Sequence, residues 1–235
     1  EEVWRAPEGD ATGWGSVSVN GGGGGDPWRQ QLTDYRSFFE QTAEPSENKR
    51  SPHPWQQALG DDPLCKDRTI RIPTGFGKTA GVVLPWLYRR VVQNDERWPL
   101  RLVFCLPMRV LVEQTEEVIG RWLQATSNKV KLHVLMGGIE AERWELEPEK
   151  PAILLGTQDM LLSRALNRGY GSGRARWPMS FGLLQQDALW VLDEVQLMDV
   201  GLSTSVQLAA FRRQDAEGRP AGAGFRRPAV VLGGD

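Results

Sequence analysis

Residues 70–79 read Ile-Arg-Ile-Pro-Thr-Gly-Phe-Gly-Lys-Thr, a β-branched run that leads into two glycines, a lysine and a threonine. Gly75 and Gly77 allow the backbone to curl so that successive N–H groups point inward and surround phosphate oxygens. A helix that begins near Lys78 would add the positive end of its dipole. In such loops the lysine reaches the outer phosphates of a nucleoside triphosphate, and the hydroxyl, here Thr79, binds Mg²⁺. The segment therefore predicts a site for ATP and Mg²⁺.

This loop departs from the general phosphate-loop pattern, because that pattern requires a glycine where Ile72 stands. The order Pro-Thr-Gly-x-Gly-Lys-Thr, from Pro73 to Thr79, is instead the helicase variant, so Thr74 joins the expected nucleotide contacts. The alternative is an ordinary glycine turn before a helix that happens to begin with Lys-Thr. Four fixed letters at this spacing arise by chance about once in a thousand chains of this length, which favours the phosphate loop.

Two acids, Asp193 and Glu194, directly follow the apolar run Leu-Trp-Val-Leu at 189–192. Ligands of parallel sheets bind beyond the carboxyl ends of the strands, so these acids are expected near the phosphate loop. Asp193 would hold Mg²⁺ through water, and Glu194 would orient and deprotonate the attacking water. An isolated acid pair after a strand is usually the start of a solvated loop, but the upstream phosphate loop favours catalysis. The expected catalytic residues are therefore Lys78, Asp193 and Glu194.

Apolar runs and amphipathic stretches alternate along the chain and would position these motifs. Strands are expected at 69–72, 100–106, 130–135, 152–155, 189–192 and 229–232, and helices at 32–39, 78–92, 109–124, 160–166 and 204–211. Pro85 should kink or interrupt the second of these helices. This alternation predicts an α/β fold with a mostly parallel sheet covered by helices on both faces.

Length and composition narrow the class of protein. The chain has 235 residues and a formal net charge of −2, so its surface is not basic as a whole and any nucleic-acid phosphate must be bound locally. Cys65 and Cys105 have neither metal-ligand nor disulfide spacing, which fits a reducing cytoplasm. No apolar run approaches the roughly 20 residues that span a bilayer, so no membrane association is expected.

The first 30 residues differ from the rest because they contain an unbroken glycine run from Gly21 to Gly25. Such a segment buries too little surface to offset its backbone entropy, so we expect residues 1–30 to be poorly ordered. Residues 31–235 would form the nucleotide-binding domain. The chain begins at Glu1 and ends just after an apolar run, so we expect it to be a piece of a longer protein.

The two motifs together resemble those of the DExD/H-box helicases of superfamily 2, whose first RecA-like domain is a P-loop NTPase fold. Residues 107–114, Pro-Met-Arg-Val-Leu-Val-Glu-Gln, are similar to a family segment that contacts the nucleic-acid backbone. The glycine doublet at 137–138 and the Gly-Thr-Gln-Asp run at 156–159 resemble two further backbone-contacting motifs. The nucleic-acid contacts that the resemblance implies are Arg109, Gly138 and Thr157.

The run Pro-Trp-Gln at 54–56 resembles the glutamine motif that reads adenine in the same family. Phe39, upstream of it, would be the stacking aromatic. The nucleotide contacts are then Phe39, Gln56, Thr74, Gly75, Gly77, Lys78 and Thr79. Mg²⁺ would be shared by Thr79 and Asp193.

Two longer strings narrow the resemblance. Both strings, residues 156–170 and the run Asp-Glu-Val-Gln-Leu-Met at 193–198, are similar to the CRISPR-associated helicase-nuclease of type I systems. Within that family the similarity is to the subtype G branch, formerly called subtype U. The resemblance covers roughly residues 32–235. It implies an ATP-driven motor that a CRISPR effector complex recruits to an R-loop. The motor would load on the displaced single strand of DNA and feed it to an HD nuclease, fused or separate, in antiviral defence.

The chain departs from this family in several ways. Gln196 replaces the usual histidine of motif II, and no Ser-Ala-Thr motif III follows Asp193. His53 and His133 stand alone, without an HD metal signature, and each is expected to be an ordinary surface or packed histidine. The second RecA domain with its arginine fingers is missing from the sequence. We therefore expect the first RecA-like domain only, truncated before motif III, which binds ATP without turnover of its own.

Several alternatives stay open at this point. The chain could belong to another superfamily-2 motor, such as an RNA helicase or a restriction-type translocase, or act only as a nucleotide-binding fragment. The run 160–186 contains no acid and interleaves arginines with Tyr170, Trp177 and Phe181. It predicts either a further DNA-contacting surface or a long solvated loop whose aromatics pack back on the domain.

Overall fold

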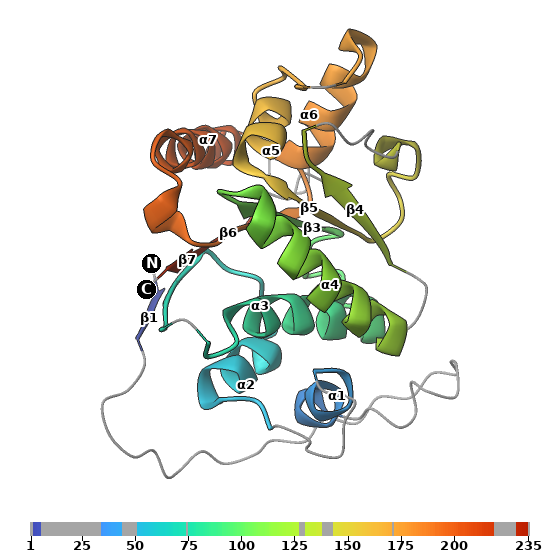
Figure 1. Cartoon of the computed structure of the whole chain (residues 1–235), viewed down its shortest axis with the longest axis vertical. Helices are drawn as coiled ribbons and strands as arrows, with labels where there is room; N and C mark the ends of the chain where they lie inside the picture. Colours follow the sequence, from blue (N-terminus) through green and yellow to red (C-terminus); the bar gives the residue numbers. More distant parts are fainter. Residues whose placement is uncertain are drawn as a thin grey trace.

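The computed structural model describes residues 2–5, 34–43, 51–73, 75–126, 130–137, 143–170, 172–218 and 229–234. The strands of this part of the chain are β1 (Glu2–Arg5), β2 (Arg68–Arg71), β3 (Arg101–Leu106), β4 (Lys131–Leu135), β5 (Ala152–Thr157), β6 (Ala188–Leu192) and β7 (Ala229–Gly234). They form one sheet in the order β1-β2-β7-β6-β3-β5-β4 (Figure 1). Every pairing is parallel, as predicted.

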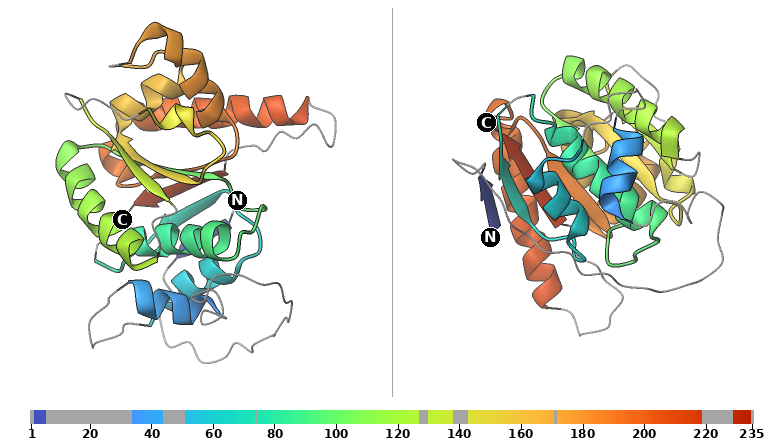
Figure 2. Two further views of the ribbon diagram at one scale, coloured as in Figure 1. Left: turned by 90° about the vertical axis from the view of Figure 1, so that its right-hand side faces the viewer. Right: turned by 90° about the horizontal axis from the view of Figure 1, so that it is seen from below.

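The helices lie in two layers, one on each side of the sheet (Figures 1 and 2). One layer holds α1 (Tyr35–Thr42), α2 (Pro54–Asp61), α3 (Lys78–Trp86) and α4 (Arg109–Thr126), and the other holds α5 (Gln158–Ala165), α6 (Trp177–Gln185) and α7 (Val200–Glu217). Short helical turns lie at η1 (Leu87–Val92), η2 (Trp144–Leu146), η3 (Arg174–Arg176) and η4 (Val195–Leu197). The predicted α/β fold with both faces covered is confirmed.

The central strands are buried on both faces, which explains their unbroken apolar sequences. All six residues of β3 are buried, and successive side chains point to opposite faces. Leu102 and Phe104 belong to the core on the α1–α4 side, whereas Val103 and Cys105 belong to the core on the α5–α7 side. A continuous apolar run thus serves two separate cores.

The predicted interruption by Pro85 is present. The α-helical pattern of α3 ends at Trp86 and is followed directly by the π-helical turn η1. Proline lacks the N–H that would bond to the Gly81 carbonyl one turn earlier, so the helix loses one backbone hydrogen bond here. Trp86 is fully buried and donates a hydrogen bond to the Pro99 carbonyl at 2.8 Å, which fixes the helix end.

Three elements differ from the sequence-based expectations. Residues Glu2–Arg5 pair in parallel with β2, where no strand was expected, while the other residues of 1–30 lie outside the described part. Helix α2 begins at Pro54, in a stretch where no helix was expected, and proline is tolerated at the first helical position. Helix α6 occupies part of a run interpreted as a loop or a DNA-contacting surface.

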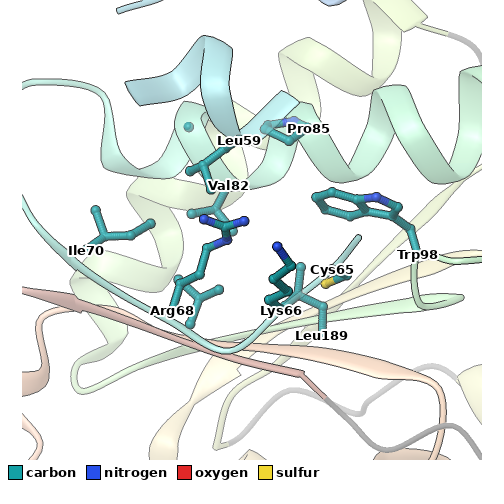
Figure 3. A pocket seen from close by; sticks show the side chains of 11 residues that line it. Leu59, Cys65, Lys66, Arg68, Ile70, Val82, Pro85, Trp98 and Leu189 are labelled. Carbon is teal, nitrogen blue, oxygen red and sulfur yellow. The ribbon is translucent and has the colours of Figure 1, made fainter. Parts of the chain in front are cut away.

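A small cavity remains in the core between α2, α3 and the sheet (Figure 3). Its volume of about 20 Å³ accommodates roughly one water molecule. The lining is mostly apolar and includes Leu59, Ile70, Val82, Pro85, Trp98 and Leu189. The buried Arg68 at its edge forms an ion pair with Asp62. The cavity is a packing gap and is far too small for a nucleotide.

Within the described residues, no helix has both the length and the apolar character that a bilayer crossing requires.

Candidate nucleotide-binding site

The phosphate loop connects β2 to α3, as its sequence predicts. Gly75 and Gly77 have φ angles of 89° and 72°, in the left-handed region that residues with a side chain rarely adopt. Gly77 also lacks room for a side chain, since a Cβ there would lie 2.8 Å from Gln56 Nε2. Lys78 is the first residue of α3 and is only 9% exposed. The loop therefore has the curled backbone and helix start that bind phosphate.

The acid pair follows β6 at the same edge of the sheet. Asp193 is buried, and Glu194 adopts a left-handed backbone with a φ angle of 55°. Lys78 Nζ lies 3.4 Å from Glu194 Oε1, although the two residues are far apart in the sequence. Gln196 Nε2 donates a hydrogen bond to Glu194 Oε2 at 2.6 Å. Both oxygens of this carboxylate are thus held, one by the phosphate loop and one by its own turn.

The strand β7 lies between β2 and β6 and therefore carries its carboxyl end between the two motifs. A Cβ on Gly233 would lie 2.6 Å from Asp193 Oδ1, and one on Gly234 would lie 3.1 Å from Gln196 Oε1. Asp193 Oδ1 also accepts a hydrogen bond from the Glu194 backbone N–H at 3.0 Å. The glycines at the end of β7 leave the space that the acid turn occupies.

The donor set fits Mg²⁺. Thr79 lies in the first turn of α3, and Asp193 lies at the end of β6 across the inserted β7. The described residues contain no group of three or more histidine, cysteine, aspartate or glutamate side chains placed to hold a metal. Mg²⁺ prefers oxygen ligands and usually keeps several waters, with one or two protein carboxylates and substrate phosphates. One hydroxyl and one carboxylate are therefore a suitable protein contribution.

A hollow of about 320 Å³ opens beside the phosphate loop. Its lining comes from α1, α2, α4 and the loop, and includes Phe39, His53, Gln56, Phe76, Arg121 and Trp122. Gln56 is 2% exposed, and its Nε2 donates to the Gly77 carbonyl at 2.9 Å while its Oε1 accepts from the His53 backbone N–H at 2.8 Å. Phe39 is 4% exposed and contributes to the wall of the hollow. The structure thus brings Phe39 and Gln56 together beside the phosphate loop.

Two of the expected nucleic-acid contacts lie at the same sheet edge, farther from the phosphate loop. Arg109 is exposed and opens α4 shortly after β3, and Thr157 ends β5 as the residue before α5. The strands are neighbours, with Leu106 paired to Thr157. Thr157 is buried, at 8% exposure, so its side chain presents little surface. Gly138 and, in the nucleotide set, Thr74 lie outside the described residues.

The run 160–186 is only partly available for nucleic acid. Arg164 is 1% exposed and donates to the Met160 carbonyl at 2.8 Å, and burial lowers the pKa of its guanidinium. Trp177 opens α6 and donates to the Ser172 carbonyl at 3.1 Å. Tyr170 remains 67% exposed beside exposed Arg168. Arg164 and Trp177 are thus held by contacts within the domain, whereas Arg168 and Tyr170 remain accessible at its surface.

Sequence reasoning missed four residues of this region: His53, Phe76, Arg121 and Gln196. Phe76 occupies the variable position of the phosphate loop, where any residue satisfies the motif, so the pattern carried no signal. His53 directly precedes the glutamine motif and Arg121 lies farther along the helix that follows the 107–114 segment, so neither residue belongs to a motif. Gln196 was noticed only as a departure from motif II, and its contact with Glu194 depends on the turn at η4.

Solved structures share this fold at low sequence identity. The DUF1998 helicase MrfA, solved bound to DNA, matches 83% of this chain with a TM-score of 0.58 and 15% identity, over 26% of the MrfA chain. MrfA bound to DNA and AMPPNP matches 83% of this chain and 25% of its own, with a TM-score of 0.54 and 16% identity. The DEAD-box helicase Mss116, bound to ssRNA and UDP-BeF, matches 77% of this chain and 35% of its own, with a TM-score of 0.50 and 18% identity.

A curated relative and a family match extend the likeness to the sequence. The probable ATP-dependent RNA helicase ddx27 of Dictyostelium discoideum is 28% identical over 143 residues, which are 60% of this chain and 17% of the relative. The chain thus spans a small part of its relatives' length. The sequence pattern of the DEAD/DEAH box helicases matches residues 54–219, which include the phosphate loop and the acid pair. The chain belongs to the DEAD/DEAH box helicase family.

Proposed function

We propose that this chain is the ATP-binding first RecA-like domain of a superfamily-2 motor that moves on nucleic acid. The observation that carries the proposal is the 3.4 Å contact between Lys78 Nζ and Glu194 Oε1. This contact supports the proposal, because a phosphate-binding cation and a general base so close together could both reach one γ-phosphate. A structural ion pair alone would not require the curled glycine backbone beside it.

The residues divide the chemistry between them. Lys78 and the loop N–H groups bind the β- and γ-phosphates, and Thr79 and Asp193 hold the Mg²⁺ that neutralises charge on them. Glu194 orients the attacking water and accepts its proton, while Gln196 holds the second carboxylate oxygen. Charge on the transferred phosphoryl group also needs an arginine from a second domain, so turnover belongs to a longer protein.

We propose that the motor moves along single-stranded DNA and acts in type I CRISPR interference. Support comes from the strings at 156–170 and 193–198, which are similar to the subtype G helicase-nuclease, and from a MrfA neighbour that was solved on DNA. In this setting a CRISPR effector complex recruits the motor to the displaced strand of an R-loop, and an HD nuclease cuts the strand. Arg109, Gly138 and Thr157 would contact its backbone.

An RNA helicase is the second candidate. The curated relative is described as a probable RNA helicase, and Mss116 was solved on ssRNA. Binding of matched DNA and RNA oligonucleotides to the longer protein, in the presence of AMPPNP, separates the two. Tighter binding of DNA than of RNA is expected, and a preference for RNA would refute the DNA proposal.

The nucleotide site is tested by titrating this chain with a fluorescent ATP analogue and Mg²⁺. Lys78→Ala should weaken binding by at least about tenfold, because a charge-assisted contact to phosphate contributes roughly 1.5–3 kcal/mol. Lys66→Ala, at an exposed lysine outside the loop, is the matched control and should leave binding unchanged. Equal affinities of Lys78→Ala and wild type would refute the proposed site.

A further inference from the structure

We infer that Phe76, at the variable position of the phosphate loop, is a stacking residue for the nucleobase and forms with His53 the outer wall of the base pocket. The inference rests on the proposed ATP site and adds to it a residue that determines affinity for the base. Neither residue belongs to the phosphate contacts or to the glutamine motif described above.

The exposure of Phe76 is the first observation. Its side chain is 51% exposed, on the phosphate loop between Gly75 and Gly77. Its ring centroid lies 5.8 Å from that of His53, with the ring planes inclined by 44°. Aromatic rings pair at such separations, so the two side chains form one continuous face.

Two further aromatic side chains line the same hollow. Phe39 and Trp122 are 4% and 6% exposed and come from α1 and α4. Trp122 Nε1 donates to the Ala43 carbonyl at 3.3 Å, which fixes the orientation of the indole ring. The volume of about 320 Å³ lies at the small end of the range for ligand sites, about 300–1,000 Å³. A hollow of this size, whose lining combines aromatic side chains with polar ones such as Gln56 and Arg121, suits one heteroaromatic ring system.

Gln56 by itself leaves the base with little to contact. It is 2% exposed, and each end of its amide already makes a hydrogen bond, to Gly77 and to His53. An amide retains one N–H and one lone pair after two such bonds, so Gln56 could make one donor and one acceptor contact to the edge of a base but offers no stacking face. The larger accessible surfaces that line the hollow are Phe76, His53 and Arg121. Stacking on Phe76 would therefore supply much of the affinity for the base.

The test compares a ligand that has a base with one that lacks it. Affinities of this chain for ATP and for inorganic tripolyphosphate, each with Mg²⁺, are measured by isothermal titration calorimetry for wild type and variants. Phe76→Leu keeps an apolar side chain but removes the aromatic face, and it should weaken ATP binding about tenfold while tripolyphosphate changes less than about twofold. Phe76→Trp enlarges the aromatic face and should bind ATP more tightly than wild type.

Val206→Ser, at a residue of α7 that is 55% exposed, controls for a change at an exposed apolar side chain and should alter neither affinity. Thermal melting, followed by circular dichroism, identifies any variant that fails to fold. If Phe76→Leu does not fold, Phe76→Trp provides the test, because its ATP affinity should be higher than that of wild type. Equal weakening of both ligands, or unchanged ATP binding by Phe76→Leu, would overturn the stacking role while leaving the phosphate site intact. Failure of wild type to bind either ligand would overturn both proposals.

Discussion

Lys78 Nζ and Glu194 Oε1 lie 3.4 Å apart, so the side chain that should bind phosphate and the one that should activate water form an ion pair. Their side chains are 9% and 20% exposed, which reduces screening by solvent. A nucleotide that engages Lys78 therefore competes with Glu194 for the same cation. A change in the contacts of Lys78, at the start of α3, therefore also changes the contacts of Glu194, in the turn after β6.

This coupling predicts that Glu194→Gln binds ATP more tightly than wild type. The substitution removes a carboxylate that competes for Lys78 and repels the γ-phosphate. Because a partly exposed pair contributes about 0.5–1 kcal/mol, the expected gain is about two- to fivefold in Kd. Titration with a fluorescent ATP analogue measures it, and Glu117→Gln on the exposed face of α4 is the matched control. Weaker binding by Glu194→Gln would contradict the competition.

Gly77→Ala should lower both stability and nucleotide affinity. The φ angle of 72° at this position is unfavourable for alanine. The new Cβ would also lie 2.8 Å from Gln56 Nε2, which donates a hydrogen bond to the Gly77 carbonyl. The expected loss is about 1–3 kcal/mol in the free energy of unfolding, from urea titration, with at least tenfold weaker ATP binding. Gly120→Ala is the control, because a Cβ at that position of α4 meets nothing within 4 Å. Wild-type values for Gly77→Ala would mean that the loop accepts a side chain.

The chain by itself should bind ATP–Mg²⁺ weakly and hydrolyse it negligibly. The charge that develops on the transferred phosphoryl group needs stabilisation that Lys78 and Mg²⁺ provide only in part. Release of phosphate, measured with and without single-stranded DNA, should remain far below one turnover per second. A steady-state rate above about 1 s⁻¹, in the range of working enzymes, would show that the catalytic set is complete in this chain.

In the longer protein, Arg109→Ala should weaken single-stranded DNA binding and spare ATP. Arg109 is exposed at the start of α4, at the sheet edge that also carries Thr157. Loss of one phosphate contact should reduce affinity about equally on all sequences and flatten the salt dependence by about one unit. Arg121→Ala serves as comparison, because that arginine of the same helix lines the base hollow and should affect ATP instead. An unchanged salt slope for Arg109→Ala would place the residue outside the DNA path.

The sequence by itself was sufficient for the fold class and for the local geometry of the phosphate loop. Strands buried on both faces read as continuous apolar runs, and the β3 run is recognisable for that reason. The loop is recognisable because its chemistry is local: Gly75 and Gly77 must adopt left-handed angles, and Lys78 must open a helix. The effect of Pro85 on its helix could also be predicted from the sequence, because the backbone hydrogen bond that its missing N–H removes lies within one helical turn.

The tertiary structure alone decided which distant residues share a site. The insertion of β7 between β2 and β6 brings Gly233 against Asp193, and no local pattern encodes strand order. Phe76 and His53 meet because α2 packs beside the loop, and both are ordinary residues in the sequence. Helix α6 was missed because its largely apolar sequence has no polar face to mark a helical period, and only Ser180 and Leu184 of its residues are buried. Local sequence specifies backbone conformation, whereas contacts across large sequence separations arise from how the buried faces of sheet and helices fit together.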